Sequence, residues 1–382
     1  MWDKEMGVTE IHLPDNQTIE QILLNQKKEM FPPFSKKKGE MSYPDKYKNI
    51  KRELIKVHNS VEKGAMASEL EKYIQEKSSV SDSEFRKGLE SALVYLNNHG
   101  KDHVDKVIEK VSELLRYFPP DKGLTPYEMF VLLCAIQIHD TGNTFGREKH
   151  EQVIGTIFDK ECSKIIPNNF ERKGIIRIAM VHGGEIFGNK DTIKILSSAT
   201  NYYNFFSVRE RLLAALLRFA DELADDISRA DRYGIESEKI PEHSKIFHYY
   251  SQSLHTVAIV GNPQNNELRL ELIYDFDSTI ARKKFIRESN EKYLIDEIYD
   301  RTIKMEKERR YCMRYLRPYF YLASIKVDIK ITDANFALVS KNISYILEEE
   351  GYPDTKIEIK ERLSGSEIVN FFEIGTKESK NG

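Results

Sequence analysis

The stretch TPYEMFVLLCAIQIHD, residues 125–140, decides the fold of this chain. Thr125 is a residue type that caps the N-termini of helices, Pro126 suits the first helical position, and Glu128 follows at the third. The run FVLLCAIQI that comes next is almost entirely apolar, so a helix built from it has no polar face to turn toward solvent. We therefore expect a central, buried helix that begins after Thr125 and runs to His139.

Helical patterns flank this stretch on both sides. Residues 102–118, DHVDKVIEKVSELLRYF, carry apolar residues at the i, i+3, i+4, i+7 spacing of an amphipathic helix, and two prolines at 119–120 end it. Further helices are expected at about 147–160, 170–182 and 207–231. Together these segments predict an all-helical bundle.

The pattern changes after Gly234. HTVAIV and LRLELIY, at 255–260 and 268–274, are separated by the turn-forming GNPQNNE and predict a β-hairpin. A charged helix at about 280–316 is expected to follow. The remaining expected elements are a strand SIKVDIKI at 324–331, a helix near 334–350 and a strand TKIEIKE at 355–361. The chain is thus expected to be mainly α, with a smaller α+β region at its C-terminal end.

Composition and charge exclude several classes of protein. The 382 residues are 40% hydrophobic and 31% charged, with a formal net charge of −3, which is the balance of an ordinary soluble globular protein. Such a charge gives no overall field to hold a long polyanion, although a local basic pocket for a small phosphorylated ligand stays open. The three cysteines are far apart and form no CxxC pair, which favours a reducing cytoplasm over a disulfide framework. No basic-then-apolar leader and no stretch of roughly 20 apolar residues is seen, so we expect a cytoplasmic protein without a membrane partner.

Candidate chemistry begins at the doublet His139-Asp140. An imidazole and a carboxylate at the end of an apolar helix can bind one divalent cation with mixed nitrogen and oxygen ligands. An ordinary helix C-terminus is the alternative. Other histidines and acids that lie in the helical part are His103, His150, His182 and Asp221. His12, His58, His243, His248 and His255 show no partner pattern, and we expect them at surface or strand positions.

The order His103, then His139-Asp140, then Asp221 resembles the pattern H…HD…D of the HD superfamily of metal-dependent phosphohydrolases. The likeness covers about residues 85–235. It implies an HD-domain helical bundle in which these four residues, contributed by three helices, are the ligands of a divalent metal such as Mg, Mn, Co, Fe or Zn. The changes of pattern along the chain, taken with this resemblance, predict an N-terminal arm at 1–45, an HD-type helical catalytic domain at 46–235, and an α+β region at 236–382 that regulates or oligomerises. The arm is expected to pack on the body through Phe31 and Phe34.

A finer likeness appears in HDTGNTFGREKHEQVIGTIFD, residues 139–159. This segment is similar to the deoxynucleoside triphosphate triphosphohydrolases, which carry HD-x-G-[HN]-x-x-F-G followed by a histidine in a HEQ-type context. The resemblance implies hydrolysis of deoxynucleoside triphosphates to deoxynucleoside and triphosphate. It also implies a nucleotide substrate, a nucleotide effector and a homo-oligomer as partners.

Roles follow for the residues around the expected metal. His150 could serve as general acid or as an electrostatic clamp on the phosphate. His182 could do the same or bind a second cation, and its alternative is a helix-end cap before two glycines. Asn143, Arg147 and Arg218 are assigned to substrate binding. Two other functions stay open: a phosphodiesterase or pyrophosphohydrolase of a signalling nucleotide, and a nucleotide-sensing HD protein whose α+β tail transmits the signal.

Overall fold

The computed structural model of the chain divides into two compact units, which we call the helical unit and the sheet unit. The helical unit comprises Met1–Ala224 with Arg314–Phe320, and the sheet unit comprises Asp225–Met313 with Tyr321–Gly382. The residues that the structure describes are 10–27, 31, 41–62, 101–145, 150–186, 188–203, 206–230, 235, 240, 242–262, 268–287, 290–333, 335, 337–338, 342–349, 359 and 362–370.

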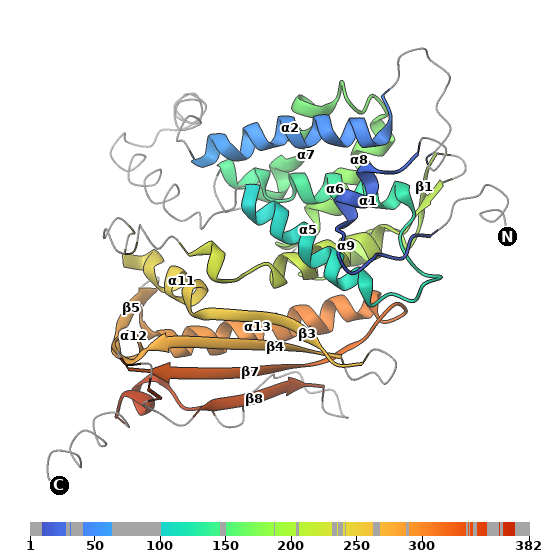
Figure 1. Cartoon of the computed structure of the whole chain (residues 1–382). Helices are drawn as coiled ribbons and strands as arrows, with labels where there is room; N and C mark the ends of the chain where they lie inside the picture. The colour runs from blue at the N-terminus through green and yellow to red at the C-terminus, as the bar shows by residue number, and fades with distance from the viewer. Residues whose placement is uncertain are drawn as a thin grey trace, which may run out of the picture. The chain divides into compact units, whose positions relative to one another are not determined.

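The helical unit is built from helices around one central helix, with a short hairpin at one edge (Figure 1). Its longer helices are α1 (Ile19–Leu24), α2 (Tyr43–Glu62), α5 (Lys101–Arg116), α6 (Pro126–Ile138), α7 (His150–Cys162), α8 (Asn169–Met180) and α9 (Glu210–Leu223). Between them lie the 3-10 helices η2 (Thr141–Phe145) and η3 (Ile193–Ile195) and the antiparallel strands β1 (Thr200–Tyr203) and β2 (Phe206–Val208). The described part of the chain is therefore mainly α, as predicted.

Helix α6 is the core of this unit. Thr125 caps it: the Thr125 hydroxyl accepts from the backbone N–H of Glu128 at 3.2 Å, and the Glu128 carboxylate accepts from the N–H of Thr125 at 3.1 Å. Every residue from Pro126 to Ile138 is buried, which is what an all-apolar helix requires. Helices α1, α2, α5, α8 and α9 all contact it. The prediction of a central helix between Thr125 and His139 is confirmed.

The N-terminal ends of α6 and α9 are joined by a partly buried ion pair between Glu128 and Arg209. Glu128 accepts hydrogen bonds from Arg209 through the backbone N–H at 3.0 Å, Nε at 2.8 Å and Nη2 at 2.6 Å. Arg209 also donates to the hydroxyl of Tyr319 at 3.4 Å, and the Tyr319 ring stacks on Phe118 with 4.8 Å between ring centroids. Residues 314–320 thus belong to the helical unit, although they follow most of the sheet unit in the sequence.

The beginning of the chain contributes to the same core. In α1, Ile19, Ile22 and Leu23 are buried, and the backbone N–H of Ile19 donates to the Ser112 hydroxyl on α5 at 3.1 Å. Phe31 is buried against the ring of Tyr43, as expected, whereas Phe34 lies outside the described residues.

The sheet unit contains a four-stranded sheet of order β3-β4-β7-β8 (Figure 1). Its strands are β3 (Leu254–Val260), β4 (Leu268–Asp277), β7 (Leu322–Thr332) and β8 (Ile343–Glu348), and its other elements are η4 (Ile227–Arg229), α11 (Glu242–Ser253), α12 (Ser278–Arg282), β5 (Lys284–Arg287), β6 (Asn290–Tyr293) and α13 (Leu294–Leu316). β3 and β4 form the predicted antiparallel hairpin. β4 and β7 are parallel, and α13 lies in the crossover between them.

Three sequence predictions in this region are wrong. The helix expected at 207–231 ends at Leu223, because Ala224 leaves helical geometry and an aspartate pair follows. The helix expected at about 280–316 is interrupted: the short helix α12 ends at Arg282, KFIR and NEKY pair with each other as β5 and β6, and α13 begins at Leu294. The helix expected near 334–350 is instead the strand β8, whose alternating exposure matches its antiparallel pairing with β7. Apart from Ile359, the strand expected at 355–361 lies outside the described residues.

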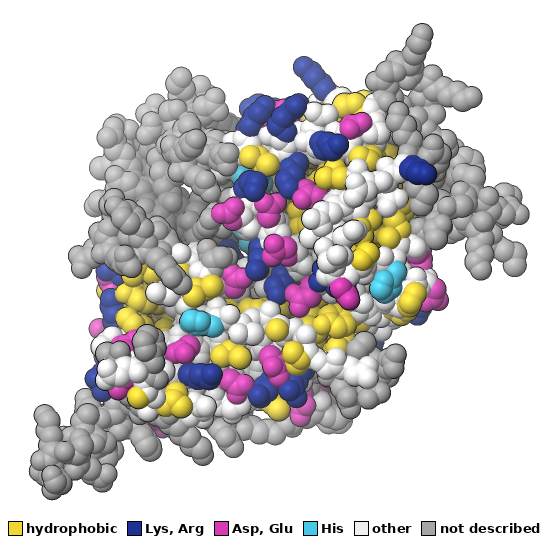
Figure 2. Space-filling model, in the orientation of Figure 1, with side chains coloured by type: hydrophobic (Ala, Val, Ile, Leu, Met, Phe, Trp, Pro, Cys, Tyr) yellow, Lys and Arg dark blue, Asp and Glu magenta, His cyan; other side chains and the backbone are white. Residues whose placement is uncertain are grey.

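Surface charge is mixed in sign. Over the coloured part of the face in Figure 2, Lys and Arg side chains are interspersed with Asp and Glu, in keeping with the net charge of −3. On that face the two signs offset each other, so the field available to attract a polyanion is weak. In the described part of the chain, none of the helices combines the length and the apolar character that crossing a membrane requires.

Candidate metal centre

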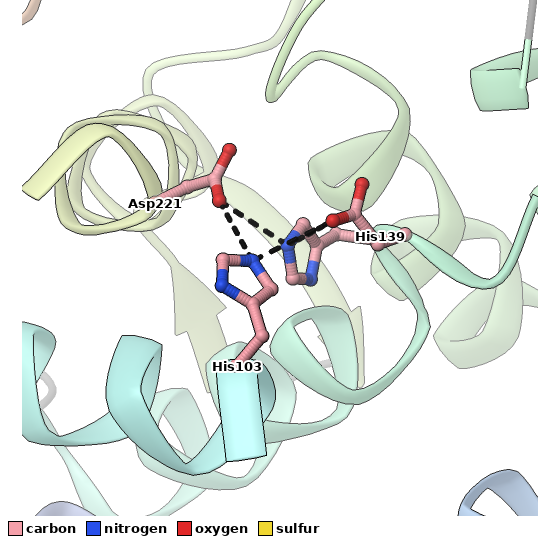
Figure 3. A group of neighbouring side chains, drawn as sticks. His103, His139 and Asp221 are labelled. Atoms are coloured by element: carbon pink, nitrogen blue, oxygen red, sulfur yellow. Dashed lines mark ion pairs between the residues drawn. The ribbon is translucent and has the colours of Figure 1, made fainter. Parts of the chain in front are cut away.

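Three elements of the helical unit bring four side chains to one place. His103 comes from the first turn of α5, His139 caps the C-terminus of α6 with Asp140 directly after it, and Asp221 comes from the last turn of α9. One ligand atom from each of the four residues lies within 4.8 Å of the others. Figure 3 shows His103, His139 and Asp221 pointing toward one another from their separate helices.

The local sequence fixes the turn that carries the doublet. The Nδ1–H of His139 donates to the carbonyl of Ile136 at 2.7 Å, which orients the imidazole ring. The hydroxyl of Thr141 donates to the carbonyl of Ile138 at 2.7 Å, and the backbone N–H of Asn143 donates to the carbonyl of Asp140 at 3.0 Å. Carbonyls that a helix end leaves without intrahelical partners are thereby satisfied, and the doublet is held in one conformation.

The two imidazoles lie close to the two carboxylates. His103 Nε2 lies 3.0 Å from Asp221 Oδ1 and 3.5 Å from Asp140 Oδ2. His139 Nε2 lies 3.5 Å from Asp140 Oδ2 and 3.6 Å from Asp221 Oδ1. Both imidazoles therefore turn the same ring atom toward the same two carboxylates.

A positive charge between the imidazoles and the carboxylates would stabilise this arrangement. Because a carbonyl can only accept, the Nδ1 of His139 must carry a proton, and in the neutral ring the Nε2 then holds a lone pair that faces two carboxylates. Burial disfavours the imidazolium, but Asp140 and Asp221 outweigh it and raise the pKa of His139 to about 9. Burial would likewise raise the pKa of Asp221, yet the neighbouring imidazoles of His103 and His139 hold it well below its ordinary value.

Two imidazoles and two carboxylates fit a divalent cation. Histidine Nε2 atoms and carboxylate oxygens are the ligands that mixed nitrogen and oxygen metal sites use. The Nδ1 bond from His139 to a backbone carbonyl supplies the outer partner that usually fixes the tautomer of a metal-binding histidine. The cluster could therefore bind a divalent metal, whose identity the ligand set leaves open.

His182 lies beside this cluster. Its ring meets that of His139 edge-on, with 5.0 Å between the centroids, and its Nε2 lies 3.6 Å from Asp140 Oδ1. The Nδ1–H of His182 donates to the carbonyl of Ala179 at 2.6 Å, one residue before the end of α8. His182 thus bonds the end of its helix and also directs its other nitrogen at the second oxygen of Asp140.

The structure gives the predicted substrate residues different surroundings. The Nη1 of Arg218 donates to the Thr192 hydroxyl at 2.9 Å, and that hydroxyl donates to the carbonyl of Val181 at 2.9 Å, so Arg218 supports the segment that carries His182. Asn143 is buried in η2, three residues after Asp140. His150 is the first residue of α7, but its side chain, like all of Arg147, lies outside the described residues.

One buried histidine near the cluster was missed by the sequence analysis. His58 was expected at a surface or strand position, and this is wrong: it is buried in α2, where its Nε2–H donates to the carbonyl of Gln137 at 3.0 Å. Burial lowers the pKa of His58. The signal was present in the sequence, because Tyr43, Tyr47, Ile50, Leu54 and His58 form one stripe at helical spacing. His248, also expected outside the core, is buried in α11.

Comparison with known proteins gives one match. A family model described as HD-CE matches residues 82–304, more than half of the chain. The matched segment contains His103, His139, Asp140 and Asp221, begins after α2 and ends within α13. Neither a curated protein nor a solved structure matches the sequence.

Proposed function

The chain belongs to the HD-CE family, and from this premise we propose that it is a metal-dependent phosphohydrolase that acts on a nucleotide. The observation that carries the proposal is the convergence of His103, His139, Asp140 and Asp221 within 4.8 Å of one another from three helices of the helical unit. His103, His139 and Asp140 are buried and Asp221 is partly buried, and two carboxylates this close together are costly to bury unless a cation offsets them.

The proposed chemistry divides between the cation and the side chains. A divalent cation would neutralise phosphate charge and lower the pKa of a water molecule, so that water can attack phosphorus near neutral pH. The four ligands would hold it in place. His182, with its Nδ1 proton committed to Ala179, would offer its Nε2 to a proton or, when protonated, would face a phosphate oxygen as a cation.

The finer proposal concerns the substrate. The segment HDTGNTFGREKHEQ supports a deoxynucleoside triphosphate, cleaved to deoxynucleoside and intact triphosphate. In this proposal His150 acts on the phosphate as a general acid, and Asn143, Arg147 and Arg218 serve the substrate.

A second candidate is a phosphodiesterase or pyrophosphohydrolase of a signalling nucleotide. The observation that favours it is the 3.6 Å distance between His182 Nε2 and Asp140 Oδ1. Asp140 presents its other oxygen, Oδ2, to His103 and His139, so Asp140 and His182 together could hold a second cation, which would help to neutralise phosphate charge.

The test is a panel of nucleotides incubated with Mn²⁺, Mg²⁺ or Co²⁺ and analysed for phosphate, pyrophosphate and triphosphate. Deoxynucleoside with triphosphate supports the first substrate, whereas a mononucleotide from a cyclic or linear dinucleotide supports the second. Asp140→Asn should abolish turnover. Asp102→Asn, which removes an exposed carboxylate next to His103, should leave turnover unchanged. Absence of hydrolysis across the panel with all three metals would refute the phosphohydrolase.

A further inference from the structure

The helices α1 and α2 precede the family match, which begins at residue 82. Nevertheless α2 packs along α6, and α1 contacts α2, α5 and α6. The hydrogen bonds made by this segment lead directly to the backbone that carries the metal ligands.

Gln137, near the C-terminal end of α6, is hydrogen-bonded to two residues of α2. It lies two residues before His139 and is 1% exposed. Its main-chain carbonyl accepts from His58 Nε2 at 3.0 Å, and its side-chain Nε2 donates to the hydroxyl of Tyr47 at 3.0 Å. Both polar ends of one buried residue in the last turn of α6 are therefore bonded to α2.

From Tyr47 the hydrogen bonds continue to the other ligand helix. The Tyr47 hydroxyl donates to Glu20 Oε1 at 2.7 Å, and Lys51 Nζ donates to the same oxygen at 2.6 Å. Lys51 also donates to Asp105 Oδ1 at 3.2 Å. Asp105 follows His103 by two residues on α5. A continuous series of polar contacts thus joins the backbone near His139 to the helix that presents His103.

The protonation states suit these roles. Burial raises the pKa of Tyr47 well above its ordinary value, and Glu20 raises it further, so the hydroxyl keeps its proton and can donate to that carboxylate. Burial lowers the pKa of His58, so its ring is neutral near pH 7, with the Nε2 proton on the carbonyl of Gln137.

We propose that α1 and α2 form a positioning element for the metal centre, with Tyr47 and His58 as its positioning residues. The inference rests on the proposed metal centre and goes beyond it, because it assigns a role to a segment that the family match does not include. Residues that hydrogen-bond metal ligands typically change metal affinity by about 10–100-fold when they are removed, and for Tyr47 and His58, which act through Gln137, we expect the lower end of this range. A ligand set also tolerates displacements of only about 0.5 Å.

The experiment measures binding of Mn²⁺ alone by calorimetry and records the visible absorption of the Co²⁺-loaded protein. Tyr47→Phe keeps the ring and removes the shared hydroxyl, and His58→Leu removes the donor to Gln137. We expect each to raise the dissociation constant by about 10-fold and to alter the Co²⁺ spectrum. His58→Gln, whose amide can donate to the same carbonyl, should restore most of the affinity.

A matched control is Tyr127→Phe. Tyr127 is also buried, and its hydroxyl donates to Glu171 at 2.8 Å, but it lies at the N-terminal end of α6, about 18 Å along the helix from His139. It should lose stability and keep Mn²⁺ affinity. If Tyr47→Phe and His58→Leu, shown to be folded by circular dichroism, bind Mn²⁺ as tightly as Tyr127→Phe, the positioning role is refuted while the metal centre stands. If the unmodified protein binds no Mn²⁺, the metal centre falls, and the inference with it.

Discussion

Metal binding should displace a proton from His139. The Nδ1 of this residue already donates to the carbonyl of Ile136, so Nε2 is the atom left for a metal. In the metal-free protein the same Nε2 holds a proton, because Asp140 and Asp221 outweigh burial and raise the pKa of His139 to about 9. The experiment is therefore to remove bound metal with a chelator and then to titrate metal into the metal-free protein at several pH values.

The magnitude follows from that pKa. At pH 7 the ring is almost fully protonated, so each cation bound should release close to one proton. Below pH 9, each unit of decrease in pH should weaken the apparent affinity about tenfold, because the proton and the metal compete for one lone pair. Asp221 adds no proton in this range, since its pKa lies well below its ordinary value.

The stability of the metal-free protein should decrease over the pH range in which the metal affinity increases. A histidine whose pKa is raised on folding contributes stability that is fully present below the unfolded value of 6.5 and is lost as the pH rises through about 9. A difference of this size corresponds to about 3 kcal/mol. The chelated protein should therefore become less stable between pH 6.5 and 9, while the stabilisation gained from added metal increases.

Calorimetry in two buffers of different ionisation enthalpy counts the protons, and thermal unfolding with and without chelator measures stability. His255→Gln, which changes an exposed histidine on β3, is the control and should leave the proton count unchanged. Metal binding without proton release at pH 7, with an affinity that is constant between pH 6.5 and 8.5, would refute the reasoning.

Three further predictions concern the scaffold. Glu128→Ala removes the carboxylate that caps α6 and binds the partly buried guanidinium of Arg209, which still has Glu10 3.6 Å away, and should lower the free energy of unfolding by about 1.5–3 kcal/mol, seen as a lower urea midpoint; an unchanged midpoint would contradict this. The three cysteines are buried, and burial raises the pKa of Cys162 to about 12, so a thiol reagent at pH 8 should label none in the native protein and three in urea, and rapid native labelling would show the opposite. In Gly123→Ala the new Cβ would lie 2.2 Å from the main-chain oxygen of Ile11, which should detach this part of the chain and speed its proteolysis; unchanged cleavage would contradict the clash.

The sequence predicted best where one local pattern decided the structure. The Thr125 cap and the apolar run after it required a buried helix, and the alternating residues of β3 and β4 required a hairpin. The resemblance to the pattern H…HD…D anticipated which side chains meet, whereas the helical periodicity alone placed Asp221 inside a helix that was expected to run to residue 231. Their role as ligands remains a prediction.

It failed where long-range pairing outweighed local pattern. Residues 343–348 are a strand because they pair with β7, a partner that local propensity cannot identify. The burial of His58 could have been predicted from the apolar stripe that it continues on α2, but its bond to Gln137 could not, because the two positions lie 79 residues apart.

The return of residues 314–320 to the helical unit has a consequence for synthesis of the chain. Tyr319 stacks on Phe118 and accepts a hydrogen bond from Arg209, so the helical unit lacks part of its own packing when its last contiguous residue, Ala224, is made. About 100 more residues must be added first, which takes roughly 5–20 s at about 5–20 residues per second. During that interval Phe118 lacks its stacking partner and can contact apolar surfaces of other proteins. A fragment that stops at Ala224 should therefore aggregate more readily than the full chain.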